Sequence, residues 1–150
     1  MIAYPDTSFL CSVYREQEHS GRADAHRLQM TEPLHVSPLL EFEFKQAIRL
    51  QVWLHQQDKT KGYSQAEADQ MLADWAFDIA TGIVQIISVD HDAVLRMAEH
   101  LSQTHTMLSG NRTLDIMHVA TAKHLSAKEF LTFDGRQKKL AKTVGLKTPL

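Results

Sequence analysis

The chain has 150 residues, of which 43% are hydrophobic, and this is enough apolar material for residues 1–150 to form a single domain around one core. Its formal net charge of −2 excludes a strong overall attraction to nucleic acid, and its one cysteine excludes an intrachain disulfide. Because no apolar run approaches the ~20 residues that span a bilayer and no signal peptide is recognisable, we expect a cytoplasmic protein without membrane contact.

Hydrophobic residues recur at strand or helix spacing in the first half of the chain, with helix-capping residues between them. The elements that this pattern predicts are, in order, a strand at 1–4, a helix over 9–14, a helix after Ser20, a strand at 34–36, a helix that Ser37 opens, a polar turn at 58–63 and a helix from 64 to about 80. Ser64 and Glu67 form a capping box at the start of the last of these helices. Trp53, Trp75 and Phe77 in the two long helices are candidates for the core.

The second half of the chain contains its clearest strand, which is predicted at 83–87 after a helix stop at Thr81 and Gly82. The elements that follow are a helix over 91–103, a loop at 107–112, a helix that Thr113 caps and that ends near 125, a strand at 129–133, a helix over 135–144 that Gly145 ends, and a short strand in the tail at 146–150. Strands thus alternate with helices. This alternation predicts an α/β fold with a mainly parallel sheet between helical layers.

Four acidic residues are predicted to meet at one edge of this sheet. Asp6 follows the first strand, Glu43 lies in the early turns of one helix, Asp115 lies in the first turn of another, and Asp134 follows the strand at 129–133. In parallel α/β folds, strand ends and the starts of the following helices share an edge, where ligands bind. Taken one at a time, the three aspartates are better explained as helix caps, whereas Glu43 lies beside an apolar stripe.

Clustered carboxylates repel one another, and burial raises their pKa values unless a cation compensates the charge. Oxygen ligands of this kind suit Mg²⁺ or Mn²⁺ rather than zinc. Two such ions held ~3.5–4 Å apart can activate a water molecule and stabilise the leaving oxygen of a phosphodiester. The residues by themselves therefore indicate a metal-dependent site, and they do not specify its substrate.

Four segments of the chain resemble the motifs of PIN domains, and they occur in that family's order. The segments are residues 2–8 (IAYPDTS), 37–47 (SPLLEFEFKQA), 112–122 (RTLDIMHVATA) and 131–137 (LTFDGRQ), followed by Leu140-Ala141 and Gly145-Leu146. The third is the most specific, because it is similar to the family's Asp-x-x-His-x-Ala segment. Together the segments span nearly the whole chain, which therefore resembles the PIN-domain ribonucleases of the VapC toxin type.

The resemblance implies a three-layer α/β/α sandwich and hydrolysis of RNA phosphodiester bonds. Carried over position by position, it makes Asp6, Glu43, Asp115 and Asp134 the catalytic, metal-binding acids. For the VapC branch it also implies the toxin component of a type II toxin–antitoxin pair, with an RNA substrate, a cognate VapB-like antitoxin and frequent homodimerisation. The two helices between 37 and 80 would then form the clip that accepts an antitoxin segment.

Two positions depart from the pattern of the family. Pro5 stands where the family usually has an apolar residue with an N–H, so the last ladder hydrogen bond of the first strand is expected to be lost. Glu41 competes with Glu43 for the second acidic position, and the spacing to Ala47 favours Glu43.

Several other polar residues have both a functional and a structural interpretation. His118 is either a general base or RNA contact, or a hydrogen-bonded structural histidine. Thr132 either orients a carboxylate or a metal-bound water, or serves its strand, and Arg112 either binds a phosphate or pairs with an acid. The basic residues between 136 and 147 form either a phosphate-binding patch or the solvated face of a helix, and they are Arg136, Lys138, Lys139, Lys142 and Lys147.

Two other functional classes compete with the nuclease. The main alternative is a catalytically silent PIN-like module that binds RNA or protein, and the complete set of four acids argues against it. The second is a phosphatase or receiver domain that uses one aspartate at a strand end. The phosphatase pattern needs a second aspartate two residues after Asp6, and Ser8 occupies that position.

Overall fold

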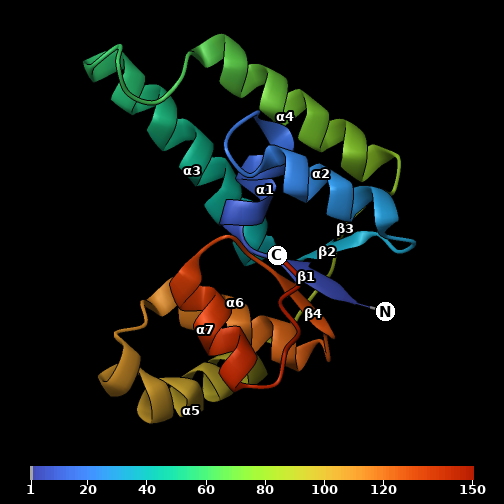
Figure 1. The fold of residues 1–150 in the computed structure, drawn as a ribbon, viewed down its shortest axis with the longest axis vertical. Coiled ribbons are helices and arrows are strands. Elements are labelled where there is room, and N and C mark those ends of the chain that lie inside the picture. The colour runs from blue at the N-terminus through green and yellow to red at the C-terminus, as the bar shows by residue number, and fades with distance from the viewer. Residues whose placement is uncertain (1) are drawn as a thin grey trace.

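Short strands lie in the centre of the computed structural model, which describes residues 2–150 (Figure 1). Within these residues the strands are β1 (Ala3–Pro5), β2 (Leu34–Val36), β3 (Val84–Ile86) and β4 (Glu129–Leu131). β1 pairs in parallel with β4, and β2 pairs in parallel with β3, so the strands form two hydrogen-bonded pairs. β1 lies beside β2, which gives the spatial order β4-β1-β2-β3. The tail contributes a single parallel bridge, from Lys147 to Glu129 on β4, in place of the short strand predicted at 146–150.

β4 ends earlier than the sequence predicts because side chains replace its backbone hydrogen bonds. Beyond Leu131, the N–H of Phe133 donates to Oγ of Ser8 at 2.9 Å, and the N–H of Asp134 donates to Oγ1 of Thr132 at 2.9 Å. Local side-chain acceptors of this kind compete with a strand ladder. They turn the chain out of the sheet directly before the helix that follows.

Pro5 does not interrupt the pairing of β1 with β4, so the ladder bond expected to be lost at Pro5 is not one that joins these two strands. The N–H of Asp6 donates to the carbonyl oxygen of Leu131 at 3.0 Å, and the carbonyl oxygen of Ile2 accepts from the N–H of Lys128 at 2.9 Å. Alternate residues of a strand direct their backbone groups to opposite neighbours, so the nitrogen of Pro5 faces β2. Proline has no N–H to donate on that side, and within residues 2–150 β1 forms a ladder with β4 but not with β2.

The helices begin and end largely where the capping residues predict. Within residues 2–150 they are α1 (Thr7–Tyr14), α2 (Ser20–Gln29), α3 (Pro38–Gln57), α4 (Gln65–Ala80), α5 (His91–Ser109), α6 (Thr113–His124) and α7 (Gly135–Thr143). Ser37 caps α3, and Ser64 and Glu67 form the predicted capping box of α4. Gly145 follows α7 at a φ of 87°, which a glycine adopts readily.

α5 continues to Ser109, so the predicted loop at 107–112 is wrong for its first residues. Gly110 ends the helix in the left-handed conformation at a φ of 63°, and its N–H donates to the carbonyl oxygen of Thr106 at 2.7 Å. The hydrophobic pattern gives no sign of this last turn because Met107 and Leu108 are 90% and 84% exposed. The turn is held by backbone hydrogen bonds rather than by packing.

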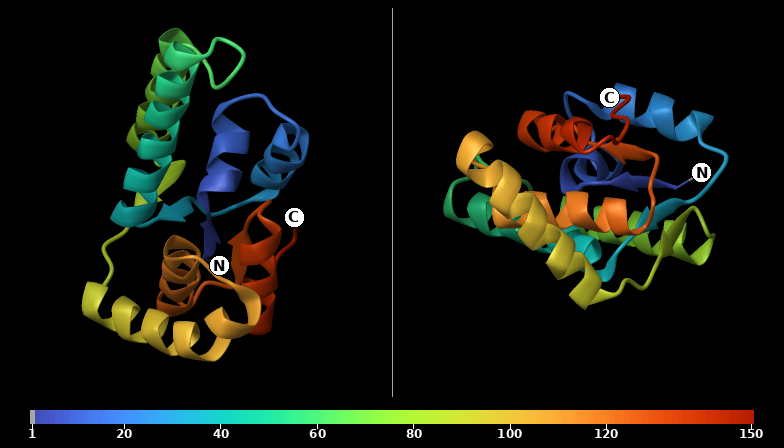
Figure 2. Two further views of the ribbon diagram at one scale, coloured as in Figure 1. Left: turned by 90° about the vertical axis from the view of Figure 1, so that its left-hand side faces the viewer. Right: turned by 90° about the horizontal axis from the view of Figure 1, so that it is seen from below.

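Helices cover both faces of the strands, which confirms the three-layer α/β/α arrangement. Seen from below in Figure 2, α2 and α7 lie on one face of the strands, and α5 and α6 lie on the other. The largest fully buried side chains come from strands and helices alike, and they include Tyr4, Phe9, Phe44, Trp75 and Phe130. None of the helices in the described part of the chain has the length and apolar content to cross a membrane.

α3 and α4 extend together beyond the strands, as Figures 1 and 2 show. Trp75 of α4 is buried as predicted, with its ring centroid 5.0 Å from that of Phe44 on α3. Trp53 and Phe77 are not core residues, because 54% and 64% of their surfaces are exposed. The prediction fails for these two because the outer part of the helix pair is covered on its inner face only.

Candidate active site

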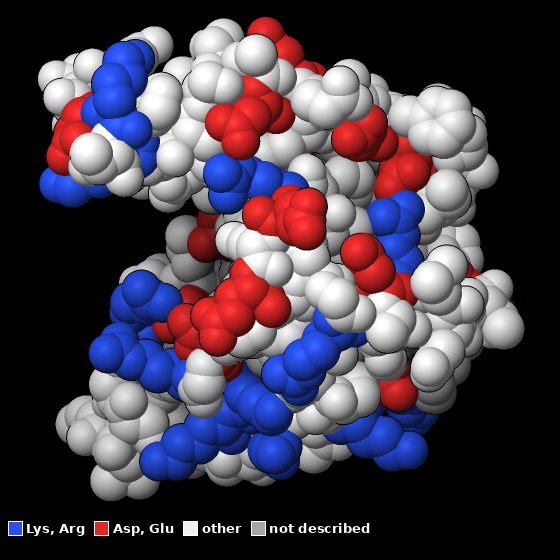
Figure 3. All heavy atoms as spheres, turned by 45° about the horizontal axis from the view of Figure 1, so that its top comes forward, with Lys and Arg blue, Asp and Glu red and all other residues white. Residues whose placement is uncertain are grey.

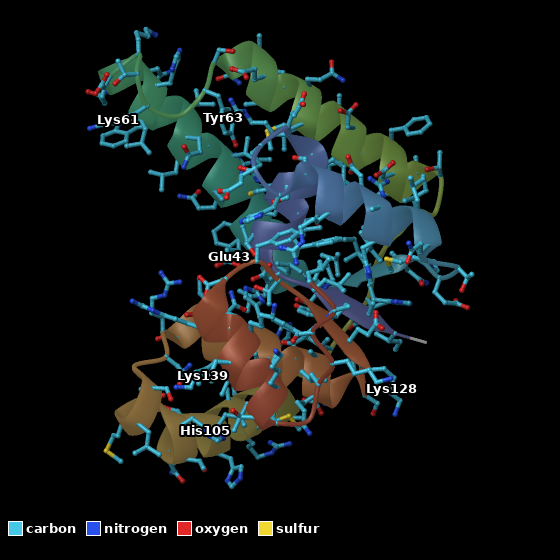
Figure 4. The ribbon with its side chains drawn as sticks, in the orientation of Figure 1. Glu43, Lys61, Tyr63, His105, Lys128 and Lys139 are labelled. Carbon is cyan, nitrogen blue, oxygen red and sulfur yellow. The ribbon has the colours of Figure 1, made fainter. Side chains whose placement is uncertain are left out.

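The four acidic residues identified in the sequence lie where β1 and β4 end. Asp6 and Asp134 directly follow these strands and are the N-caps of α1 and α7. Asp115 lies in the first turn of α6. Glu43 lies in the early turns of α3, where this helix approaches α6 and α7 (Figure 4). The three aspartates thus lie at the N-terminal ends of helices, where the helix dipole favours negative charge, whereas Glu43 lies beyond the first turn of α3.

Asp6 is fully buried, and both of its carboxylate oxygens accept hydrogen bonds. Oδ1 accepts from the N–H of Phe9 at 2.9 Å and from Oγ of Ser8 at 2.6 Å, and Oδ2 accepts from Oγ1 of Thr132 at 2.5 Å. Burial raises the pKa of Asp6 to about 6, although these hydrogen bonds favour the charged form. At neutral pH the interior therefore contains a carboxylate that a nearby cation would stabilise.

This raised pKa leads to a prediction about stability without metal. The pKa of Asp6 is about 6 in the fold and 3.8 in an unfolded chain, so the folded state binds the proton more tightly. The free energy of unfolding should therefore fall as the pH rises from below 3.8 to above 6, by an amount on the order of 3 kcal/mol from Asp6. Urea unfolding in EDTA should find Asp6→Asn less stable relative to wild type at acidic pH than at neutral pH. A difference between the two proteins that does not change with pH would contradict this account.

Two hydroxyl side chains connect the ends of β1 and β4. Oγ1 of Thr132 donates to Asp6 and accepts from the N–H of Asp134, and it lies 3.4 Å from Oγ of Ser8. Thr132 is buried, and in this position it orients the Asp6 carboxylate, which is one of the two roles considered from the sequence. No role in the site is predicted from the sequence for Ser8 and Thr7. Their position next to an acid at a strand end is the signal that would have identified them.

Glu43 is held by a hydroxyl from α1 and an imidazole from α6. Its Oε2 accepts from Oγ1 of Thr7 and from Nε2 of His118, each at 2.5 Å. A carboxylate oxygen only accepts, so Nε2 of His118 carries the hydrogen. Burial alone would raise the pKa of Glu43, but the hydrogen bond and charge of His118 outweigh it, and the pKa lies below its usual value.

Glu41, the competing candidate for the second acidic position, lies on another side of α3. Its Oε1 forms an ion pair with Nζ of Lys45 at 2.7 Å and accepts from Nε1 of Trp75 at 3.2 Å. Residues two apart on a helix face different directions. Of the two glutamates, Glu43 is the one that the structure places with the aspartates.

Arg112 lies between two of the aspartates. Its Nε donates to Oδ2 of Asp115 at 3.0 Å, and its guanidinium lies 3.6 Å from Oδ2 of Asp134. The hydrogen bond and charge of Asp115 raise the pKa of Arg112. Arg112 also occupies the N-cap position of α6 that the sequence assigned to Thr113, without a side-chain cap bond. Its side chain serves as a counter-ion instead.

The chemistry of this group of side chains fits a hard divalent cation. All four acids offer oxygen ligands, and Oε1 of Glu43 and Oδ1 of Asp115 accept no hydrogen bond from residues 2–150. In the arrangement described, no three carboxylate, imidazole or thiol groups of residues 2–150 are placed to hold one ion. Arg112 and His118 pair with three of the acids, so a cation would compete with these two side chains.

One face of the molecule is hollowed. Figure 3 shows a deep notch between an upper arm and the lower body of the molecule, with acidic atoms on its floor and basic atoms along its lower margin. A polyanion that entered this notch would meet positive charge at the margin before it reached the acids.

Comparisons with known proteins identify the fold. The VapC20 toxin of Mycobacterium tuberculosis, which cleaves the sarcin-ricin loop, has a TM-score of 0.68 at 14% identity, over 97% of this chain and 96% of its own. FitAcB from Neisseria gonorrhoeae has a TM-score of 0.64 at 14% identity, over 98% and 96%. PAE2754 from Pyrobaculum aerophilum has a TM-score of 0.57 at 15% identity, over 99% and 89%. These identities are low, so the likeness establishes the fold alone.

A sequence comparison establishes the family. No curated protein matches the chain. The family model described as the PIN domain, however, matches residues 3–143 and so includes all four acids. The chain belongs to the PIN domain family.

Proposed function

We propose that this protein is a metal-dependent endoribonuclease of the VapC type, the toxin component of a type II toxin–antitoxin pair that acts on RNA in the cytoplasm. The observation that carries the proposal is the contact network around the four acids in a PIN-family chain: Arg112 pairs with Asp115 and Asp134, and Thr132 links Asp6 to Asp134. Glu43 joins the network through Thr7, next to Asp6. Burying the Asp6 carboxylate costs free energy that a bound cation would offset, and this favours the nuclease over a silent PIN-like binding module. The similar fold of a toxin that cleaves the sarcin-ricin loop supports RNA as the substrate.

The four acids would hold Mg²⁺ or Mn²⁺, which supplies an activated water and stabilises the charge on the leaving oxygen. The other residues of the site orient these ligands. Ser8 and Thr132 hold both oxygens of Asp6, and Thr7 and His118 hold Oε2 of Glu43. Partners that fix a ligand's position reduce the reorganisation needed when the cation binds.

His118 and Arg112 have different roles in this proposal. His118 is fully buried and directs its Nε2 hydrogen at Glu43, so it positions a ligand and is not an RNA contact or a general base. Arg112 has 62% of its side chain exposed and can move away from Asp115 and Asp134 when a cation replaces it. The released guanidinium can then pair with a phosphate oxygen.

Metal binding should stabilise the folded protein. A cation that binds only the native state adds about 2.7 kcal/mol at a hundredfold excess over its Kd. Mg²⁺ or Mn²⁺ at millimolar concentration should therefore raise the Tm of the wild type by several degrees, and that of Asp6→Asn by less. Differential scanning calorimetry with and without EDTA measures both shifts. Equal shifts would indicate a general ion effect and not binding at these acids.

The reaction itself is tested with purified protein and a panel of structured RNAs, one of which carries a sarcin-ricin-type loop. Internal cuts mapped by primer extension should appear when Mg²⁺ or Mn²⁺ is present. Because the attacking group is water, the fragments should carry no 2′,3′-cyclic phosphate. Cyclic phosphate ends would mean that the ribose hydroxyl attacks, and they would count against metal-activated hydrolysis.

The proposal includes two partners, a VapB-like antitoxin and a second copy of the chain. Apolar side chains on the outer faces of α3 and α4 offer surface for either one, and the exposed ones are Phe42, Leu50, Trp53 and Phe77. An amphipathic helix laid against two helices is a common recognition mode. Light scattering on the purified chain distinguishes a homodimer from a monomer.

A further inference from the structure

A second, basic cleft lies between the end of α5 and the first half of α7. Its volume is about 210 Å³, and its lining includes His105, Asn111, Arg136 and Lys139. Figure 4 shows Lys139 on α7 near His105 on α5. No acidic residue lines this cleft in the described part of the chain.

The cleft directly adjoins the carboxylates. Asn111 immediately precedes Arg112, which pairs with Asp115 and Asp134. Gly135, which also lines the cleft, immediately follows Asp134. The lining of the cleft thus begins one residue away from Arg112 and from Asp134. An RNA strand bound over the acids would therefore extend into the cleft.

The cations of the cleft have no acidic partner. Neither Arg136 nor Lys139 forms an ion pair with any side chain of residues 2–150, and both are exposed. Their charge is uncompensated although Asp134 is close in sequence, because Oδ1 of Asp134 binds backbone N–H groups of α7. Unpaired cations beside a carboxylate cluster suit an anionic group that extends from the acids.

Asn111 supplies an independent sign of a ligand. It is 9% exposed, and its buried Oδ1 has no hydrogen-bond partner within residues 2–150. A buried acceptor without a donor costs about 1–3 kcal/mol. Within residues 2–150 the Asn111 side chain forms no hydrogen bond, and it lines this cleft. A ligand with a hydroxyl donor would satisfy this acceptor.

In the proposed reaction, a hydroxyl donor on the ligand would distinguish RNA from DNA. Hydrolysis by a metal-activated water does not use the ribose 2′-hydroxyl, so the chemistry itself does not distinguish RNA from DNA. The distinction has to come from a binding contact, and the 2′-hydroxyl is the group that differs. Asn111 is an unsatisfied acceptor next to the acids, and it lies beside cations that suit phosphate.

We propose that this cleft binds a ribonucleotide next to the cleaved bond, with Arg136 and Lys139 on its phosphate and Asn111 on its 2′-hydroxyl. The inference rests on the proposed function and adds where the substrate chain runs and how RNA is selected. His105 closes the cleft on the side of α5.

Binding is measured without cleavage, by fluorescence anisotropy in EDTA with one short single-stranded RNA and the DNA of the same sequence. The double variant Arg136→Ala/Lys139→Ala should weaken RNA binding by at least about tenfold and reduce the slope of log K against log salt by about 1.4. The control Lys128→Ala/Lys142→Ala removes the same charge at exposed positions that do not line the cleft. It should change both quantities much less.

Asn111→Ala tests the hydroxyl contact separately. It should lower the ratio of RNA to DNA affinity roughly fivefold, the size expected of one neutral hydrogen bond, and leave the affinity for DNA unchanged. Its Tm should not fall below that of the wild type, because the side chain gives up no hydrogen bond within the described residues and its buried acceptor is unsatisfied there.

Three outcomes overturn the inference in distinguishable ways. If the charge-matched control weakens binding as much as the cleft variant, the cleft is not a specific site. If Asn111→Ala lowers the affinities for RNA and DNA equally, the hydroxyl contact is wrong. If the wild type binds no RNA at low salt, the proposed function fails together with the inference.

Discussion

Replacing Asp115 with asparagine is expected to reduce RNA cleavage by roughly a thousandfold, about 4 kcal/mol of activation free energy. The amide keeps the shape of the side chain and can still accept from Arg112, but it loses the charge that would hold the cation. Asp115 is buried beside a counter-ion, so no other acid can replace it without a rearrangement. Initial rates of cleavage of one labelled RNA at saturating Mg²⁺ measure the loss.

α3 offers a matched pair of variants for the same assay. Glu43→Gln should lose activity to a similar extent, whereas Glu41→Gln should stay within a few fold of the wild type. Glu41 binds Lys45 and Trp75, away from the aspartates, and glutamine can still accept from the indole. A folded Asp115→Asn protein with undiminished activity would contradict the assignment of the four acids as catalytic residues. If Glu41→Gln were inactive and Glu43→Gln active, Glu41 rather than Glu43 would be the second acid of the site.

Growth arrest is the second large effect expected of this protein. Expression of the wild type without a partner should stop the growth of a bacterial host, because cleavage of an essential RNA halts protein synthesis. Asp6→Asn should restore growth at the same protein level, since it removes the charge of the most buried acid of the site. Colony counts on inducing plates, with immunoblots for the protein level, measure the effect.

Relief of the growth arrest by an antitoxin has a physical basis of its own. An arginine from a partner would pair with the carboxylates in the way that Arg112 pairs with Asp115 and Asp134, and would compete with the cation. Co-expression of a small neighbouring gene product should therefore restore growth of the wild type. If the wild type is harmless in its native host after any neighbouring gene is deleted, the toxin role is wrong, although the nuclease assignment can survive.

The features that the sequence predicts well are those set within a few residues. The capping box of Ser64 and Glu67 depends on residues three apart, and it is present as predicted. The placement of Asp6 and Asp134 at one edge follows from the rule that parallel strands end on the same side. The last turn of α5 was missed because Met107 and Leu108 are exposed and a helix without a buried face has no hydrophobic period.

The features that the sequence does not predict depend on contacts between distant segments. The bond from Thr132 to Asp6 joins residues 126 positions apart, and no local pattern encodes it. The contact of His118 with Glu43 likewise depends on how α6 packs against α3. The exposure of Trp53 depends on how far α3 extends beyond the sheet. A tryptophan in the sequence does not reveal whether a neighbouring segment covers it.

The central claim is that these carboxylates cut RNA by means of a divalent metal ion. The most direct test is cleavage of one RNA by the purified wild type as Mg²⁺ or Mn²⁺ is added to metal-free protein. We predict no cleavage in EDTA, and a rate that rises with metal concentration and saturates over the range in which the Tm rises. Full activity in EDTA, or a metal-stabilised protein that cuts no RNA in the panel, would contradict the claim.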